Sequence, residues 1–284
     1  MSLNRLPVKK GRPILLFALL AGVVALMVAL AKCSRNEAYG PTIQPRYEKS
    51  GGDTLDVAVE ISPLSYRFSG DSVTGLDYEL MNAVSRISNR PVKYRVFASL
   101  ESTLADMEEK GMYDVVISSL PSTQSLKKKY TLSEPLYLDY EVLVQRSGDA
   151  GFISETHRLG GDTVWIAPGS PFKERLQNLS SEIAEPIFIE QPEGRTAEHL
   201  VMMVAKGEIP RAVVNAGIAQ QMHRLYYPEL DLSIPVSFNQ FQCWILSSRV
   251  PSFPDSMNIW ISRLKESPDY RRILHEWHVN QPAP

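Results

Sequence analysis

Apolar residues between positions 54 and 140 alternate between strand-like runs and helix-like spacing. Continuous or alternating apolar runs of three to six residues predict strands. Between them, leucines and valines three or four positions apart predict helices with one face packed on a sheet. Alternation of this kind predicts βαβ units, in which helices cover a parallel sheet. The strands are predicted at 55–60, 92–97 and 115–117, and the helices at 76–87 and 100–107, with Gly111 ending the second.

The same alternation returns after residue 140. Two consecutive α/β halves of roughly 90 residues each predict two lobes. A crevice between two lobes is a common ligand site. The second series of strands is predicted at 141–146, 164–167, 212–214 and 241–247, and its helices at 171–179, 196–206, 216–225, 254–266 and 268–277.

The N-terminal region has a different pattern. Residues 14–31 form an uninterrupted run of 18 apolar or small residues, about 27 Å long as a helix and sufficient for the hydrocarbon core of a bilayer. Basic residues are in excess before the run, which predicts a cytoplasmic N-terminus (1–13) and an exported remainder. We therefore expect a single-pass anchor in the inner membrane, a linker at 32–53 and a C-terminal domain in the periplasm.

Two alternatives to the anchor remain open. A cleaved signal peptide would usually have a shorter apolar region. Lipoprotein processing at Cys33 would usually require a small residue before the cysteine, and Lys32 is not small.

Composition excludes several functional classes. The 284 residues are 44% hydrophobic and 22% charged, with a net charge of −2, which is ordinary for a globular protein and gives no reason to expect a nucleic-acid partner. No zinc-binding spacing of Cys and His is present. His275 and His278 lie three residues apart, but no third ligand is evident, so we expect neither a metal nor a cofactor.

Small hydroxyl residues follow the strand predicted at 115–117. Ser118, Ser119, Ser122 and Thr123 would lie past its carboxyl end, where open α/β sheets bind ligands. The alternative is a surface loop rich in turn formers.

Three further residues are candidates for the cleft. Ser170 precedes Pro171 at a predicted helix start, where free backbone N–H groups would face a ligand, although a plain helix cap explains it equally well. Tyr66 and Phe97 are candidate stacking surfaces, with a place in the core as the alternative.

Several segments in this order resemble one known family. "LDVAVE", "TGLDYELMNAVS", "GMYDVVISSLPST", "SEPLYLDYEVLVQR" and "VWIAPGSPFKERL" are similar to segments of the extracellular solute-binding proteins of family 3. "TAEHLVMMVAKGEIPRAVVNAGIA", "YYPELDL" and "FNQFQCW" are closer to one branch, the non-catalytic N-terminal domain of membrane-bound lytic transglycosylase F. The resemblance covers about residues 54–279.

The resemblance implies a two-lobed α/β fold, the periplasmic-binding-protein type II fold, preceded by one transmembrane helix. Lobe 1 would comprise 54–142 and 234–284, and lobe 2 would comprise 143–233. Two crossing segments between the lobes would form a hinge that closes on a ligand.

Departures from the family pattern bear on the ligand. The arginine that holds the ligand carboxylate in amino-acid binders corresponds to Leu126, and the aspartate that holds the ammonium corresponds to Asn215. Ile61 stands where the family usually has a cleft aromatic. A zwitterionic amino acid would lose both charge partners, which is expensive in a closed cleft. The resemblance therefore implies a site of Tyr66, Ser118, Ser119, Thr123, Ser170 and Asn215 for some other small polar ligand, or a site that has been lost.

These observations give two functional hypotheses. The first is a membrane-tethered solute-binding module in the cell envelope, with a peptide or cell-wall fragment as ligand and an envelope transporter or wall enzyme as partner. The second is a protein–protein interaction or regulatory module with a vestigial cleft, partnering a peptidoglycan lytic enzyme. No catalytic motif is present, and the catalytic glutamate of the transglycosylase branch belongs to a separate C-terminal domain, so we expect no enzymatic activity.

Overall fold

The computed structural model describes residues 53–282, which belong to one compact unit that spans 49–284. The membrane segment predicted at 14–31 and the linker at 32–53, apart from Asp53, lie outside the described residues. Within 53–282, every helix is too short or too polar to cross a bilayer.

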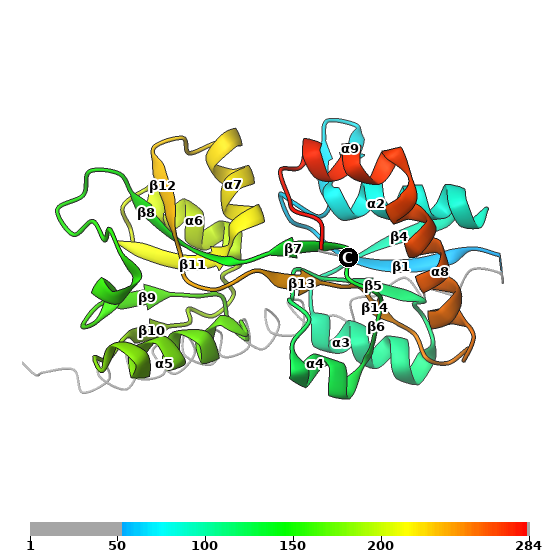
Figure 1. The fold of residues 1–284 in the computed structure, drawn as a ribbon, viewed down its shortest axis with the longest axis horizontal. Coiled ribbons are helices and arrows are strands. Elements are labelled where there is room, and N and C mark those ends of the chain that lie inside the picture. Colours follow the sequence, from blue (N-terminus) through cyan, green and yellow to red (C-terminus); the bar gives the residue numbers. More distant parts are fainter. Residues whose placement is uncertain (1–52, 283–284) are drawn as a thin grey trace, which may run out of the picture. The chain divides into compact units, whose positions relative to one another are not determined.

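The first sheet has the strand order β4-β1-β5-β14-β6 (Figure 1). Its parallel part consists of β1 (Leu55–Glu60) between β4 (Val92–Phe97) and β5 (Val115–Ile117). β1 is buried along almost its whole length because helices cover both of its faces, as expected for a central parallel strand. β14 (Ile245–Leu246) extends the sheet in the antiparallel sense and pairs with β6 (Thr131–Leu132).

The second sheet has the order β10-β9-β11-β8-β12. Its strands β9 (Thr163–Trp165) and β10 (Phe188–Glu190) are parallel, and β9 is also parallel to β11 (Arg211–Asn215). β8 (Glu141–Arg146) is antiparallel both to β11 and to β12 (Leu230–Pro235).

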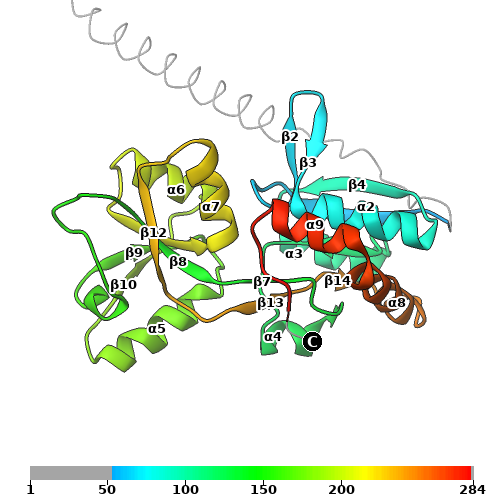
Figure 2. The ribbon, with the colours of Figure 1, turned by 45° about the horizontal axis from the view of Figure 1, so that its top comes forward.

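Two adjacent segments join the sheets (Figures 1 and 2). β7 (Tyr137–Asp139) leads through Tyr140 into β8, and β12 leads back into β13 (Gln240–Gln242), which pairs with β7. The Val236 N–H donates to the Glu141 carbonyl at 2.8 Å, so the two connections are hydrogen-bonded where they cross. The family resemblance implies crossing segments near 140–144 and 233–238, and both connections run through these residues.

Helices cover both faces of the first sheet. On one face, α2 (Leu76–Ser88) packs with α8 (Phe253–Glu266) and α9 (Pro268–Glu276). On the other face lie α3 (Leu100–Ala105), its π-helical extension η1 (Asp106–Lys110) and α4 (Gln124–Lys129). The predicted helix end at Gly111 is observed, since Gly111 has a φ of +64° and caps the π-helical turn.

The second sheet is covered in the same way. The helices are α5 (Phe172–Ile183), α6 (Ala197–Ala205) and α7 (Ala216–Leu225), with the short 3₁₀ turn η2 (Thr156–Leu159). α6 and α7 contribute to the main hydrophobic core, whereas α5 and η2 contribute to a separate core cluster.

Several short strands differ from the prediction. The strand predicted at 241–247 is divided into β13 and β14, which pair with different partners. β10, the hairpin of β2 (Arg67–Ser69) and β3 (Ser72–Thr74), and β6 and β7 are not predicted. Each has only two or three residues, so no periodicity can develop, and its partner strand defines it.

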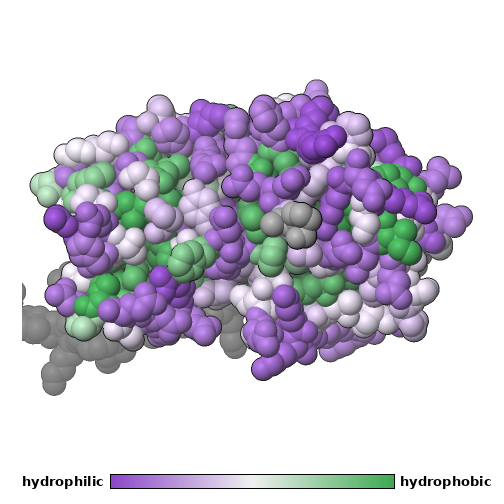
Figure 3. All heavy atoms as spheres, viewed as in Figure 1, coloured by the Kyte–Doolittle hydropathy of each residue, from purple (hydrophilic) through white to green (hydrophobic). Residues whose placement is uncertain are grey.

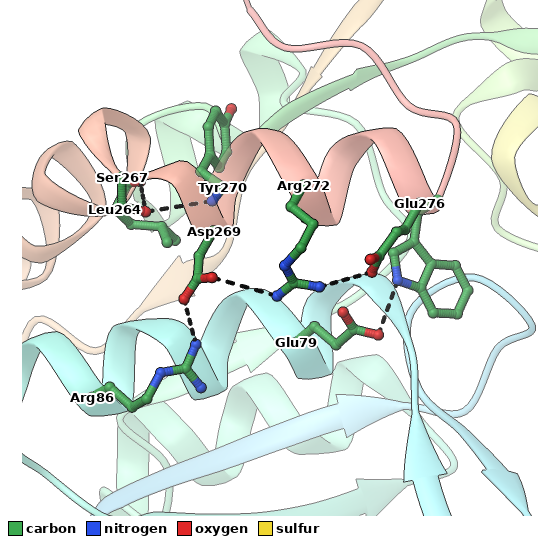
Figure 4. Close-up of polar contacts among 9 residues, drawn as sticks. Glu79, Arg86, Leu264, Ser267, Asp269, Tyr270, Arg272 and Glu276 are labelled. Carbon is green, nitrogen blue, oxygen red and sulfur yellow. Dashed lines mark hydrogen bonds and ion pairs between the residues drawn. The ribbon is translucent and has the colours of Figure 1, made fainter.

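The start of α9 provides a first test of the fold (Figure 4). Ser267 Oγ donates to the Leu264 carbonyl at 2.6 Å and accepts from the Tyr270 N–H at 3.4 Å, which satisfies groups at the end of α8 and the start of α9. Ser267→Ala is expected to lower the free energy of unfolding by about 1 kcal/mol, as loss of an N-cap usually does. Urea unfolding would measure it. Ser125→Ala, at an exposed site in α4, should change stability by less than about 0.5 kcal/mol, and equal effects of the two substitutions would contradict the capping role.

Candidate functional site

A cavity of about 610 Å³ lies between the carboxyl ends of the parallel strands of both sheets. Strand ends of this kind are where open α/β folds bind ligands. The first sheet contributes the end of β1, the loop after β5, and parts of α3 and α4. The second contributes the loop between β9 and α5, the start of α6, the end of β11 and α7. The lining residues are Glu60, Leu100, Glu101, Leu104, Ser118–Leu120, Leu126, Lys129, Tyr130, Ala167–Phe172, Arg195–Glu198, Val213–Asn215 and Ile218.

The peptide of Ser119 connects the two sides of this cavity. Its N–H donates to Glu60 Oε2 at 2.9 Å, which links the ends of β1 and β5. Its carbonyl accepts from Asn215 Nδ2 at 3.3 Å, from the end of β11 in the second sheet. Asn215 is buried and stands at the start of α7. A chain of hydrogen bonds therefore crosses the cavity from Glu60 to Asn215.

The charged residues in the lining differ in solvent exposure. Glu60 and Glu198 are half-buried, whereas Lys129, Arg195 and Glu101 are exposed at the rim. Burial raises the pKa of Glu60, and the negative charges of Glu198 and Asp77 raise it further, against the lowering effect of the Ser119 N–H. The interior of the cavity is thus acidic, and its cations lie at the mouth.

Apolar side chains supply much of the remaining wall. Leu100, Leu104 and Leu126 line the side of the first sheet, and Phe172 and Ile218 line the side of the second. A cavity with an apolar wall and a few polar groups is typical of small-molecule sites.

Four of the six residues predicted from the sequence come together around the cavity. Ser118 and Ser119 lie on one side, and Ser170 and Asn215 lie on the other. Ser170 Oγ accepts from the Phe172 N–H at 3.2 Å, so it satisfies part of the first turn of α5. That helix begins at Phe172, one residue later than predicted.

The other two predicted residues lie outside the cavity lining. Tyr66 is buried in an aromatic cluster, with ring centroids 5.5 Å from Tyr94 and 5.6 Å from Tyr78. Thr123 Oγ1 accepts from the Leu126 N–H at 3.1 Å and caps α4. The structure assigns both side chains to local packing or capping contacts.

Leu126 and Ile61, which stand where the family usually has an arginine and a cleft aromatic, differ in position. Leu126 lines the cavity, whereas Ile61 is 49% exposed and lies outside the lining. An arginine at position 126 would face a ligand here, and a leucine there offers no charge to a carboxylate.

Sequence reasoning missed Glu60 and Glu198. Glu60 is the last residue of β1, and a charged residue that ends a buried parallel strand is a usable signal for a site. Glu198 lies in the first turn of α6 and carries no such signal. Glu198 and Glu60 line the same cavity only because the strand ends of the two sheets face each other, which the sequence does not show.

Among residues 53–282, no group of three or more metal-ligating side chains is present. The rings of His275 and His278 lie 6.4 Å apart at the end of α9.

Comparison with known proteins agrees with this geometry. The family model of bacterial extracellular solute-binding proteins, family 3, matches residues 55–280. A membrane-bound lytic murein transglycosylase F of Shewanella halifaxensis is 27% identical over 192 residues, covering 68% of this chain and 39% of the relative. A protein of the same name from Desulfosudis oleivorans is 23% identical over 264 residues, covering 90% of this chain and 56% of the relative. The chain thus spans between two-fifths and somewhat over half of the length of these relatives.

Solved structures show the same fold. A structure from work on glutathione import via GshT and the cystine ABC importer TcyBC of Streptococcus mutans aligns with a TM-score of 0.70 at 15% identity, over 81% of this chain and 98% of the other. An ancestral arginine-binding protein bound to arginine aligns with a TM-score of 0.66 at 15% identity, over 79% of this chain and 98% of the other.

The family match covers nearly all the described residues, and the fold has two sheets whose strand ends face one cavity. The resemblance found in the sequence is confirmed. The chain belongs to the bacterial extracellular solute-binding proteins, family 3.

Proposed function

We propose that this chain is a non-catalytic solute-binding module that holds a small ligand in the cavity between its two sheets. The observation that carries the proposal is the cavity itself, about 610 Å³ and lined from both sheets at their strand ends. This volume lies within the range of about 300–1,000 Å³ that is usual for small-molecule sites.

The position of the cavity supports a binding cycle. Only two adjacent connections join the sheets, and they cross near Glu141 and Val236. A pair of short connections lets two lobes open and close around a ligand with little change inside either lobe. The hydrogen bond from Asn215 to Ser119 would break on opening and form again on closure.

Location in the cell envelope is part of the proposal. The apolar run at 14–31 and the basic residues before it support a membrane tether with the binding domain outside the cytoplasm. Relatives named as lytic murein transglycosylases support a partner among wall enzymes, with the bound solute as the signal.

A second candidate is an interaction module whose cavity is vestigial. Leu126 in place of a charged contact favours it. Against it, Figure 3 shows hydrophilic side chains over most of the drawn face, with hydrophobic ones in separate patches. Contiguous apolar patches usually mark stable interfaces.

Thermal unfolding in the presence of a panel of small solutes tests the proposal. The panel would contain amino acids, amino-acid amides, short peptides, amines and muropeptides. A solute at 100 times its dissociation constant is expected to stabilise the protein by about 2.7 kcal/mol. Isothermal titration would confirm each hit.

Ser118→Trp is the matched control. Ser118 lines the cavity and its side chain makes no hydrogen bond within the described residues, so an indole here would fill the cavity without removing a hydrogen bond. The unfolding temperature of the variant should be the same with and without each solute. If no solute of the panel raises the unfolding temperature of the unmodified protein, the result would instead favour the interaction module.

A further inference from the structure

The acidic interior of the cavity bears on what kind of solute it accepts. Glu60 and Glu198 come from different sheets and both line the cavity. Within residues 53–282 no ion pair is formed by either carboxylate, and the direct partners of Glu60 both belong to Ser119, whose N–H donates to Oε2 at 2.9 Å and whose side chain also hydrogen-bonds to it. Two half-buried carboxylates thus face the same space without a protein cation between them.

This arrangement is electrostatically unfavourable when the cavity is empty. Partial burial removes water from Glu60, and the second carboxylate repels it. The raised pKa of Glu60 has these same two causes, with desolvation the larger. A cationic group placed between Glu60 and Glu198 would relieve both, because charge-assisted hydrogen bonds are strongest where water is excluded.

The basic residues of the lining do not occupy that place. Lys129 and Arg195 are both exposed, and within residues 53–282 neither forms an ion pair with Glu60 or Glu198. The rest of the half-buried lining is neutral or apolar, with Asn215 and Ser118 among its polar side chains and Leu126 and Ile218 among the apolar ones. The interior therefore offers a site for an ammonium group and an apolar wall for the carbon chain that carries it.

The half-buried part of the lining offers no cation to a carboxylate. At the starts of α5 and α7 the first backbone N–H groups are engaged: those of Ala216 and Gly217 donate to Tyr140 and Asp139, and that of Phe172 donates to Ser170. A ligand carboxylate inside the cavity would face Glu60 without a cation of its own, which is costly in a poorly hydrated space.

We propose that the cavity selects a small solute with a primary ammonium group on an apolar chain and with its carboxyl group absent or blocked, held by Glu60 and Glu198. An amine or the amino end of an amidated or peptide-linked residue has this chemistry, and a free α-amino acid does not. The inference rests on the proposed function and specifies which charged group the bound solute carries.

Leucine and two of its derivatives share one carbon skeleton and differ in which charged groups they carry, so they test the ammonium and the carboxylate separately. Leucinamide keeps the ammonium and lacks the carboxylate, N-acetylleucine keeps the carboxylate and lacks the ammonium, and leucine has both. Titration calorimetry on the full chain is expected to show binding of leucinamide at least about tenfold tighter than leucine, and no binding of N-acetylleucine. Hexylamine should bind and hexanoate should not.

Variants assign the effect to residues. Glu60→Gln retains an oxygen for the Ser119 N–H and removes the charge, so leucinamide affinity should fall about 10- to 100-fold. Glu198→Gln should give a smaller loss, and Glu101→Gln, at the exposed rim, should change affinity by less than about twofold. Ser118→Trp should abolish binding of leucinamide.

The outcomes divide clearly. Unchanged leucinamide affinity in Glu60→Gln, or tighter binding of N-acetylleucine than of leucinamide, would overturn the inference. If other solutes bind and Ser118→Trp blocks them while amines do not bind, the inference fails and the proposed function stands. If no probe binds at all, both fail.

Discussion

Replacing Asp77 with alanine is expected to lower the free energy of unfolding by about 3–5 kcal/mol, the largest effect of any substitution considered for this fold. Asp77 lies in the first turn of α2, and its carboxylate is fully enclosed. It accepts hydrogen bonds from Trp244 Nε1 at 2.8 Å, Ser65 Oγ at 2.7 Å and Tyr137 Oη at 3.2 Å.

The three donors explain the magnitude. They come from segments 12, 60 and 167 residues away in sequence, so the carboxylate joins α2, β7 and the segment before β14. Alanine would leave all three donors buried without an acceptor, and each such loss costs about 1–3 kcal/mol. Removal of a desolvated charge offsets part of this, since burial raises the pKa of Asp77 even against its three donors.

Urea unfolding monitored by tryptophan fluorescence would measure the effect of Asp77→Ala. Asp77→Asn retains one oxygen acceptor and is expected to lose less than half as much stability. Asp71→Ala, in the exposed turn of the β2–β3 hairpin, should be near wild type. A wild-type midpoint for Asp77→Ala would show that the donors find other partners.

Asp77 also shows how far the sequence could be interpreted. Its position near a helix start was predictable, because short polar residues favour that place. Its role as the acceptor for three distant donors was not predictable, because Ser65, Tyr137 and Trp244 meet it only once β1, β7 and β14 are in place.

Long elements of the fold were predictable for a different reason. α2 carries Leu76, Leu80 and Val84 at helical spacing, and all three are buried. α7 begins and ends where it was predicted, at Ala216 and Leu225. A local period is visible in one sequence, and it fixes both the type of element and the buried face.

The candidate site was partly predictable. Ser118 and Ser119 were found because they follow a predicted strand, past whose carboxyl end open α/β sheets bind ligands, and Asn215 was found through the family resemblance. Tyr66 was chosen for its aromatic ring, although buried aromatics are more often core, and it packs on Tyr78 and Tyr94.

The connection between the sheets contains two carboxylates that are almost completely buried. Glu141 accepts from Gln240 Nε2 at 2.9 and 3.2 Å, a contact between β8 and β13. Asp139 accepts from the N–H groups of Tyr140 at 2.9 Å and Gly217 at 3.1 Å. Both carboxylates therefore form hydrogen bonds within or beside the crossing segments, whose backbone would have to change when the lobes move.

Burial raises the pKa of Glu141 to about 7, the donor Gln240 and the charge of Arg175 offset this in part, and the nearby Asp139 carboxylate adds to it. Burial likewise raises the pKa of Asp139 to about 6. In the unfolded chain, a glutamate has a pKa of about 4.3 and an aspartate about 3.9. Between those values and the raised ones, the folded protein binds more protons than the unfolded chain, so stability falls as pH rises.

The stabilisation from a protonated Glu141 is thus fully present below about pH 4.3 and is lost as the pH rises through about 7. Asp139 acts in the same direction, with its loss centred near pH 6. Glu141→Gln keeps an oxygen for Gln240 and cannot ionise. We expect its free energy of unfolding to exceed that of the wild type by about 3–4 kcal/mol at pH 8, since the pKa rises from about 4.3 to about 7 and each pKa unit is worth about 1.4 kcal/mol, and by only about 1 kcal/mol near pH 5.

Urea unfolding of both proteins between pH 5 and pH 8 would measure this difference. Glu229→Gln removes an exposed carboxylate beside β12 and should follow the wild-type curve. A constant offset between wild type and Glu141→Gln over this range would mean that Glu141 does not titrate there. A difference in the free energy of unfolding that grows with pH would show that Glu141 titrates at the crossing between the sheets. Protonation of Glu141 and ligand binding in the cavity would then both act on the opening and closing of the lobes.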